Sequence, residues 1–269
     1  MIEAKTRSPV PEELVPGLSA IVITKNEAAN IGDCLDSLAF CDERIVVDSG
    51  SDDDTAAIAR AKGARVVDHA FAGYGKQKNV ALALAQGDWV LSLDADERVS
   101  DALGEEIRAA IARGDADGYE MPRLSTFCGR TMRHSGWYPD YVLRLFRRSK
   151  GRFSDDIVHE HVICGGRVAR LSEPLLHFPV AKLEDALSRM DRYSTAGAEA
   201  LVASGRSVSF ISGFAHGLYT FVRTYILRAG FLDGREGFLL AVANAEGTYY
   251  RYMKAWLMAR AANAHRREK

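Results

Sequence analysis

Short continuous apolar runs alternate with amphipathic segments through the first part of the chain. The intervening segments repeat apolar residues at helical spacing, as Ile31, Leu35 and Leu38 do. Strands that are apolar throughout and alternate with helices predict a mostly parallel sheet with helices on both faces. The four runs with the length of buried strands are residues 19–24, 44–48, 64–68 and 89–93.

The pattern changes twice further along the chain. Residues 76–86 read as a helix with Gly87 as its stop, and short extended pieces separated by turns fill 118–179. From residue 182 the periodicity is helical. We therefore predict four consecutive parts: a flexible tail (1–16), an α/β domain (17–180) divided into halves at about 117 and 118, and a helical extension (181–269).

Composition restricts the class of protein. The chain has 269 residues, 47% of them hydrophobic, and a net charge of −1, so it lacks the basic balance of a nucleic-acid-binding protein. Its four cysteines form no Cys-x-x-Cys pair, which favours reduced thiols over a zinc site. No signal-peptide pattern and no run of about 18 apolar residues occurs, so we expect a cytoplasmic protein whose lipid contacts are interfacial.

Asp94 and Asp96 form the most informative motif. They follow the apolar run 89–93, where a buried strand ends, and an extended backbone can direct both carboxylates to the same side. Carboxylates in this arrangement suit Mg²⁺ or Mn²⁺ better than zinc. A cation held there can neutralise a diphosphate as it leaves.

Two earlier strands also end in polar loops. The first runs into Thr24-Lys25-Asn26-Glu27, and the second ends in Asp48, Ser49 and Gly50. Because ligands bind at the carboxyl ends of strands in parallel sheets, these loops and Asp94 are expected to share one edge. Asp48 is a candidate acceptor of a base or ribose hydrogen bond, whereas Asp53 equally suits a helix-capping role.

The order and spacing of these motifs resemble family 2 glycosyltransferases with the GT-A (Rossmann-like) fold. The resemblance implies a UDP-sugar donor and a Mg²⁺ or Mn²⁺ ion. It places Thr24, Asn26, Glu27 and Asp48 in the nucleotide pocket, Asp94 facing the ribose or the metal, and Asp96 on the metal. Many members have Asp-Asp-Gly-Ser where this chain has Asp48-Ser49-Gly50-Ser51. The matching stretches are 23–27, 47–55, Lys78-Asn79 and 87–97.

Two further residues have both a functional and a structural interpretation. Lys78 is a candidate phosphate contact or part of a solvated helix face. His177 is a candidate third metal ligand, as in some GT-A enzymes, or a core histidine between apolar neighbours.

The second half of the domain must supply the catalytic base. An inverting transfer needs a carboxylate that removes the proton of the acceptor hydroxyl. The resemblance points to Glu160 in Val158-His159-Glu160, with Asp140 and Asp156 as rivals and a salt-bridged structural acid as the alternative. A glycosidase carboxylate pair is disfavoured because it has no use for nucleotide-like loops.

Acceptor residues are expected nearby. Trp137, Tyr138 and Asp140 offer an aromatic platform with a carboxylate, and Arg144 alternates with apolar residues on a strand. Ordinary packing is the alternative for the aromatic pair.

The C-terminal helices interleave aromatic residues with arginines, which suits the headgroup layer of an anionic membrane. Packing on the catalytic domain or in a homo-oligomer explains the same pattern. The stretch from Tyr225 to Gly237, with Arg144-Leu145-Phe146-Arg147, resembles bacterial lipopolysaccharide inner-core β-glucosyltransferases.

That resemblance implies glucose transfer from UDP-glucose to a heptose of the lipid-linked core, peripherally at the cytoplasmic face of the inner membrane. Three alternatives stay open: transfer to polyprenyl phosphate, a sugar nucleotidyltransferase and a non-catalytic membrane scaffold.

Overall fold

The computed structural model describes residues 17–154, 160–180 and 182–267, with the backbone alone for 262–267. The tail predicted for 1–16 lies outside these residues. The chain forms two compact units and enters each of them more than once. The first contains residues up to Ala95, Asp101–Glu120 and Leu143–Arg170; the second contains Asp96–Ser100, Met121–Val142 and the chain from Leu171 onward. The three consecutive segments predicted after the tail stay a prediction.

A parallel sheet forms the core of the first unit. Its central strand β1 (Leu18–Thr24) pairs with β2 (Glu43–Asp48) on one side and β4 (Trp89–Asp94) on the other, and β3 (Arg65–Asp68) follows β2. The register aligns Thr24 with Asp48 and Ile23 with Asp94, so the polar strand ends meet at one edge. β8 (Asp140–Arg147) then adds antiparallel to β4.

Helices connect these strands as the periodicity predicts. They are α1 (Ile31–Ser37), α2 (Thr55–Ala61), α3 (Tyr74–Leu84) and α4 (Asp101–Arg113). Side chains of α3 pack with Ile21, Ile45 and Val90 in the core of the sheet. The predicted stop at Gly87 is wrong, because α3 ends at Leu84 with Ala85 as its cap.

Gly87 is needed instead for a close chain approach. A Cβ there would lie 2.5 Å from the carbonyl oxygen of Gly17, which is too short for any real side chain.

A short β-hairpin packs against α3. β9 (Gly151–Phe153) pairs antiparallel with β10 (Val162–Cys164). The Asn79 side chain both donates to the Phe153 carbonyl oxygen and accepts from its N–H, at 3.0 and 2.9 Å. This pair of hydrogen bonds fixes α3 beside β9.

The second unit has its own strands. β12 (Leu175–Val180) runs parallel to the end of β6 (Gly118–Phe127) and antiparallel to β5 (Glu97–Arg98). β7 (Arg130–Thr131) pairs with β6, whose start, in the first unit, pairs with β11 (Val168–Arg170). Pairing of His177 with Glu97 brings β12 alongside the short segment that begins at Asp96.

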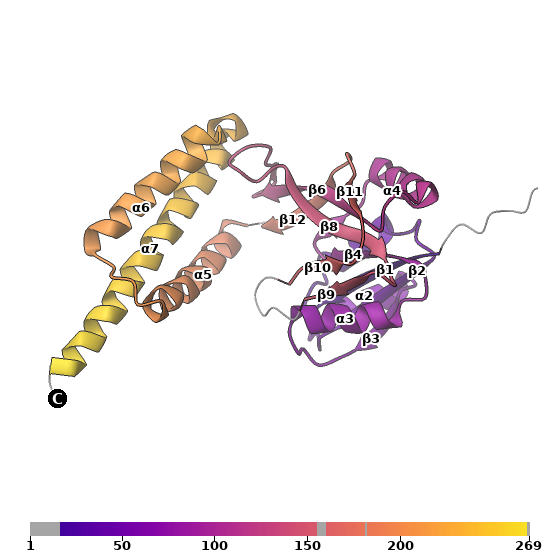
Figure 1. Ribbon diagram of the computed structural model, residues 1–269, viewed down its shortest axis with the longest axis horizontal. Coiled ribbons are helices and arrows are strands. Elements are labelled where there is room, and N and C mark those ends of the chain that lie inside the picture. Colours follow the sequence, from indigo (N-terminus) through magenta and orange to yellow (C-terminus); the bar gives the residue numbers. More distant parts are fainter. Residues whose placement is uncertain (1–16, 155–159, 181, 268–269) are drawn as a thin grey trace, which may run out of the picture. The chain divides into compact units, whose positions relative to one another are not determined.

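Three long helices complete the second unit, and α7 packs against both of the others (Figure 1). They are α5 (Leu183–Ala203), α6 (Phe210–Val222) and α7 (Gly234–Arg267), with a π-helical turn (Arg223–Leu227) and a 3-10 turn (Gly230–Asp233) between the last two. Gly217 permits the contact of α6 with α7, because a Cβ there would lie 3.3 Å from the Ala245 carbonyl oxygen. None of the described helices is long and apolar enough to cross a membrane. The predicted α/β fold with a helical extension is confirmed.

Gly75 allows the closest contact of α3 with the neighbouring chain and supplies a test of this packing. A Cβ at Gly75 would overlap the Ser154 carbonyl oxygen, so Gly75→Ala should destabilise the protein by about 1–3 kcal/mol, the usual cost of overpacking. Urea unfolding measures this change. Gly32→Ala in α1 is the matched control, since its Cβ would make ordinary 3.5 Å contact with Ile58 and should leave stability equal or higher. Equal stability of both variants would contradict the proposed close packing.

Candidate active site

The loop after β2 is built around the carboxylate of Asp48. Its oxygens accept hydrogen bonds from the Gly50 and Ser51 N–H groups at 3.1 and 2.8 Å and from the Ser51 hydroxyl at 2.5 Å. Gly50 has a φ of +77°, a conformation that favours glycine. Asp48 is therefore buried in its own turn, and its predicted contact with a nucleotide stays a prediction.

The loops after β1 and β2 are hydrogen-bonded to each other. Asn26 has a φ of 57°; its N–H donates to the Ser51 hydroxyl, and its side-chain oxygen accepts from the Asp52 N–H, both at 2.8 Å. The Glu27 N–H donates to the Thr55 hydroxyl at 2.8 Å. Thr24, Asn26, Glu27 and Asp48 therefore lie together at one edge, as the sequence predicts for parallel strands.

Asp53 stabilises the start of α2. Its carboxylate accepts from the hydroxyl and N–H of Thr55 and from the Ala28 N–H. The hydrogen bond from the Thr55 side chain lowers the pKa of Asp53 below its usual value. These contacts favour the capping interpretation over a role in ligand binding.

Lys78 joins two acidic residues that are far apart in the sequence. Its side chain is only 3% exposed, and its Nζ lies 2.9 Å from Asp94 Oδ1 and 3.0 Å from Glu160 Oε1. The other Asp94 oxygen lies 2.5 Å from Arg144 Nη2. The solvated-face interpretation of Lys78 is therefore wrong. We call these four residues the Lys78 cluster.

Charge keeps Asp94 ionised. Burial by itself raises the pKa of this carboxyl group, but the Coulombic attraction of Arg144 and then Lys78 outweighs it and holds the pKa well below the usual value. Arg144, predicted as an acceptor residue, thus contacts a carboxylate assigned to the donor side.

The second unit brings Asp96 and His177 together. The Phe178 N–H donates to the Asp96 carbonyl oxygen at 2.9 Å, and His177 Nε2 lies 3.6 Å from Asp96 Oδ2. His177 Nδ1 contacts the Ser125 hydroxyl at 2.8 Å. A hydrogen bond to one ring nitrogen is the usual means of orienting the other toward a metal ion.

No group of three or more His, Cys, Asp or Glu side chains suited to a metal ion occurs in the part of the chain that the structure describes. Asp96 and His177 nevertheless fit Mg²⁺ or Mn²⁺ as a partial donor set. Magnesium commonly takes one or two carboxylates and completes its shell with water and substrate phosphates, and imidazole is acceptable to transition metals.

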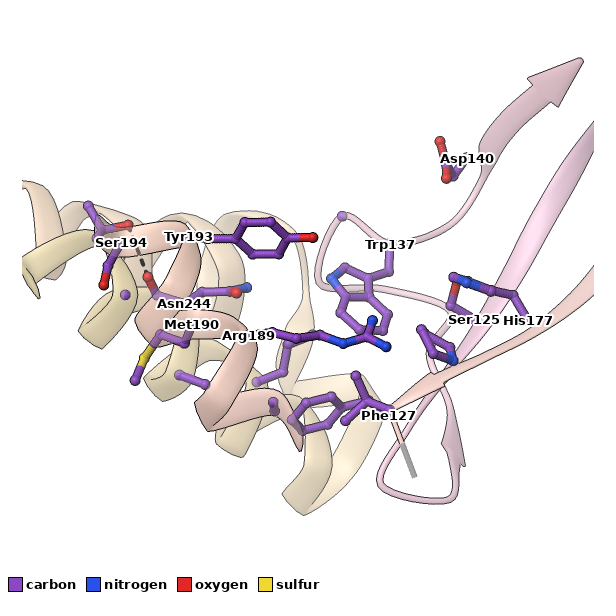
Figure 2. A pocket seen from close by; sticks show the side chains of 18 of the residues that line it. Ser125, Phe127, Trp137, Asp140, His177, Arg189, Met190, Tyr193, Ser194 and Asn244 are labelled. Carbon is purple, nitrogen blue, oxygen red and sulfur yellow. Dashed lines mark hydrogen bonds between the residues drawn. The ribbon is translucent and has the colours of Figure 1, made fainter. Parts of the chain in front are cut away.

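A cavity of about 610 Å³ lies within the second unit. Trp137, Asp140 and His177 line it together with α5 and α7 (Figure 2). Trp137 packs edge-on against Phe127, with ring centroids 5.9 Å apart. Of the predicted acceptor residues, Trp137 and Asp140 therefore face a cavity, whereas Tyr138 is not part of its lining.

The rivals for the base have different surroundings. Asp140 forms a salt bridge with Arg123 at 2.6 Å. Asp156, like Val158 and His159 of the predicted base motif, lies outside the described residues. Glu160 stays the predicted base, and its contact with Lys78 also agrees with the salt-bridge alternative.

Two residues at these places have structural roles that the sequence did not indicate. Gln77, fully buried, bonds the Ser49 hydroxyl and the His69 carbonyl oxygen, and so joins α3 to the ends of β2 and β3. Asp233 accepts from the N–H groups of Arg133 and His134 and fixes the loop that precedes Trp137. The only sequence signals for these two were the Lys78-Asn79 pair next to Gln77 and the Tyr225–Gly237 stretch that contains Asp233.

Comparison with known proteins gives the family. The sequence model for glycosyl transferase family 2 matches residues 19–172. The lipopolysaccharide core biosynthesis glycosyltransferase LpsC of Rhizobium meliloti is 33% identical over 241 residues, which cover 85% of this chain and 87% of that protein. An uncharacterized glycosyltransferase of Rickettsia felis is 30% identical over 253 residues and 88% of each chain.

Solved structures give weaker similarity. Glucosyl-3-phosphoglycerate synthase from Mycobacterium tuberculosis, in complex with Mn²⁺, UDP and glucosyl-3-phosphoglycerate, is 22% identical with a TM-score of 0.47 over 72% of this chain and 82% of that one. TarS of S. aureus is 21% identical with a TM-score of 0.45 over 69% and 40%. The family model matches more than half of the chain, and the sequence identity to LpsC extends over most of it. This chain therefore belongs to glycosyltransferase family 2.

Proposed function

We propose that this glycosyltransferase transfers a sugar from a UDP-sugar to a lipid-linked saccharide. The proposed sugar is glucose, and the proposed acceptor is the heptose of the lipopolysaccharide inner core. The relative LpsC, which aligns with 85% of the chain, is a lipopolysaccharide core biosynthesis glycosyltransferase, and this supports the lipopolysaccharide acceptor. The observation that carries the chemistry is the Lys78 cluster, in which one buried ammonium holds Glu160 beside Asp94 at the end of β4.

The edge of the first unit suits the nucleotide. Asn26 and Asp48 fix two adjoining loops, which leaves their backbone groups pre-organised for a ligand. The Thr24 hydroxyl oxygen is buried and has no hydrogen-bond partner among the described residues. A buried polar atom without a hydrogen-bond partner lowers stability unless a ligand or water bonds to it. This supports Thr24 as a contact of the UDP-sugar.

Asp96 and His177 would hold the Mg²⁺ or Mn²⁺ ion, and Asp94 stays a further candidate ligand. When bound, the ion supplies positive charge that stabilises the departing diphosphate. Ser125 keeps His177 oriented for this role through the 2.8 Å contact with Nδ1.

Glu160 is the proposed base. Lys78 fixes its carboxylate within the first unit, and Asn79 fixes β9, the strand that comes before Glu160 in the sequence. In an inverting displacement Glu160 removes the proton of the acceptor hydroxyl while that oxygen attacks the anomeric carbon and the bond to the diphosphate breaks. Trp137 and Asp140 are the proposed contacts of the acceptor sugar.

The helical extension is the proposed membrane contact. Large apolar side chains on α6 face solvent, with Ile211 76% and Leu218 66% exposed, and Leu232 in the following turn is exposed as well. Residues 200–232 contain no acidic residue but include Arg223 and Arg228. An exposed apolar face with basic and without acidic residues suits the headgroup layer of an anionic bilayer.

The first test measures UDP release from several UDP-sugars with truncated lipopolysaccharide as acceptor and Mg²⁺ or Mn²⁺ present. We expect UDP-glucose to be the best donor and a chelator to abolish turnover. Asp96→Ala should lower kcat/KM by about 100-fold or more, because metal stabilisation of the leaving group is worth several kcal/mol. The exposed Asp88→Ala is the control. Near-normal turnover in Asp96→Ala would refute the role of Asp96 in metal binding. If the unaltered protein binds a UDP-sugar but shows no turnover, the alternative of a non-catalytic membrane scaffold is favoured.

The second test separates the two interpretations of Glu160. Glu160→Gln keeps the shape of the side chain and should lower kcat by about 100- to 10,000-fold, the range for general base catalysis. Its cost in unfolding free energy should stay near 1–2 kcal/mol, because Lys78 retains Asp94 as a partner. Unchanged kcat with reduced stability would leave Glu160 as a structural acid only.

The third test concerns the membrane. The protein should co-sediment with phosphatidylglycerol vesicles more strongly than with phosphatidylcholine vesicles. Replacing both Ile211 and Leu218 by Asp should weaken this binding by about 10-fold or more, since apolar insertion and attraction to anionic lipid are both reduced. Phe71→Asp in the first unit, which is also exposed, is the matched control. Equal vesicle binding by the two variants would exclude α6 as the docking face.

A further inference from the structure

The cavity of the second unit has a wall that the sequence motifs did not indicate. The helices α5 and α7 contribute Arg189, Tyr193, Asn244 and Arg251 to its lining, opposite the strand and loop residues that include Trp137 and His177. Its volume of about 610 Å³ falls within the range of about 300–1,000 Å³ that is usual for small-molecule sites. The helical extension therefore forms part of a ligand-sized site.

Two aromatic rings occupy the cavity rim. Tyr193 is 70% exposed although it belongs to a long packed helix, and Figure 2 shows it extending from α5 toward Trp137. The Asp233 carboxylate fixes the loop of residues 133–135 that leads to Trp137. Exposed, positioned aromatic rings offer apolar faces on which a sugar ring can stack.

Positive charge in the cavity is only partly neutralised. Arg123 is paired with Asp140 at 2.6 Å and lies 3.6 Å from Glu97. Arg189 and Arg251, by contrast, have no acidic partner among the residues that the structure describes. The cavity thus has two guanidinium groups available for an anion.

The Arg251 side chain is fixed by packing, but one of its N–H groups has no hydrogen-bond acceptor among the described residues. Its side chain packs on α5, where a Cβ at Gly197 would lie 2.5 Å from Arg251 Cδ, and its guanidinium lies 5.3 Å from the Tyr252 ring centre. Its Nε is buried and lacks a hydrogen-bond partner among the described residues. A buried, unsatisfied N–H of a fixed guanidinium is the arrangement that a bound oxyanion completes.

We propose that Arg189 and Arg251 bind a phosphomonoester carried by the saccharide acceptor, while Trp137 and Tyr193 hold the neighbouring sugar ring. A phosphomonoester carries a charge of about −1.5 to −2 near neutral pH, which matches two unpaired guanidinium groups, whereas a carboxylate matches one. This inference rests on the proposed function, since it names a feature of the acceptor.

The test uses the full chain and a deacylated oligosaccharide from deep-rough lipopolysaccharide, with its phosphomonoesters either intact or removed enzymatically. Isothermal titration measures the affinity of both forms. The unaltered protein should bind the phosphorylated form about 10-fold or more tightly than the other, because two charge-assisted hydrogen-bonding groups are lost on dephosphorylation. In the double variant Arg189→Gln, Arg251→Gln this preference should fall to about twofold or less. Arg192→Gln, an exposed arginine of α5 outside the cavity, should retain it.

Several results would overturn the proposal: equal affinities for the two forms, retention of the preference in the double variant, or no binding of either oligosaccharide. Loss of phosphatidylglycerol vesicle binding in the double variant, with the oligosaccharide preference retained, would assign the arginines to lipid headgroups instead. The single variant Arg189→Gln is measured as well, since its half-buried side chain can be replaced without opening the packing of Arg251 on Gly197.

The transfer assay keeps the two proposals separate. Phosphate-dependent binding that needs both arginines, without sugar transfer, would leave the anion site in place and refute the proposed function. Transfer that proceeds equally well to both acceptor forms in the double variant and the unaltered protein would refute the anion site alone.

Discussion

The constraint on which the first unit depends is the burial of the Lys78 ammonium. Removing a charged amine from water costs several kcal/mol, and the cost is offset only where opposite charges meet it closely. Asp94 from β4 and Glu160 from the segment before β10 do so at 2.9 and 3.0 Å. Both carboxylates must therefore approach α3 from separate parts of the chain. Gly75 permits the close approach of Ser154 and Glu160.

Charge balance in the Lys78 cluster bears on the chemistry. Lys78 and Arg144 contribute two positive charges, and Asp94 and Glu160 contribute two negative ones, so these ion pairs are neutral before a substrate binds. Under the proposed function, a departing nucleoside diphosphate would find no net positive charge in these ion pairs. A divalent ion is a simple source of positive charge for such a leaving group, and this chemistry agrees with the metal-binding roles proposed for Asp96 and His177.

The parts of the molecule that could be predicted from the sequence are those set by local pattern. The runs at 19–24 and 89–93 became strands because most of their residues are apolar. Parallel pairing then brought Thr24, Asp48 and Asp94 to one edge. The contact of Lys78 with Glu160, 82 residues away, has no local signal. Arg189 and Arg251 likewise look like the solvated face of amphipathic helices, and only the packing of α5 with α7 gives them a shared cavity.

Under the proposed function, the helical extension meets two needs of a lipid-linked acceptor with one set of helices. Its α6 exposes apolar side chains with no acidic residue nearby in the sequence, whereas α5 and α7 supply the unpaired guanidinium groups of the cavity. A lipid anchor and a phosphorylated sugar differ in polarity and cannot be bound by the same surface. Placing the apolar face on one helix and the charged lining on the other two separates these requirements. In the proposed complex, the lipid of the acceptor would stay in the bilayer while its charged saccharide enters the polar cavity.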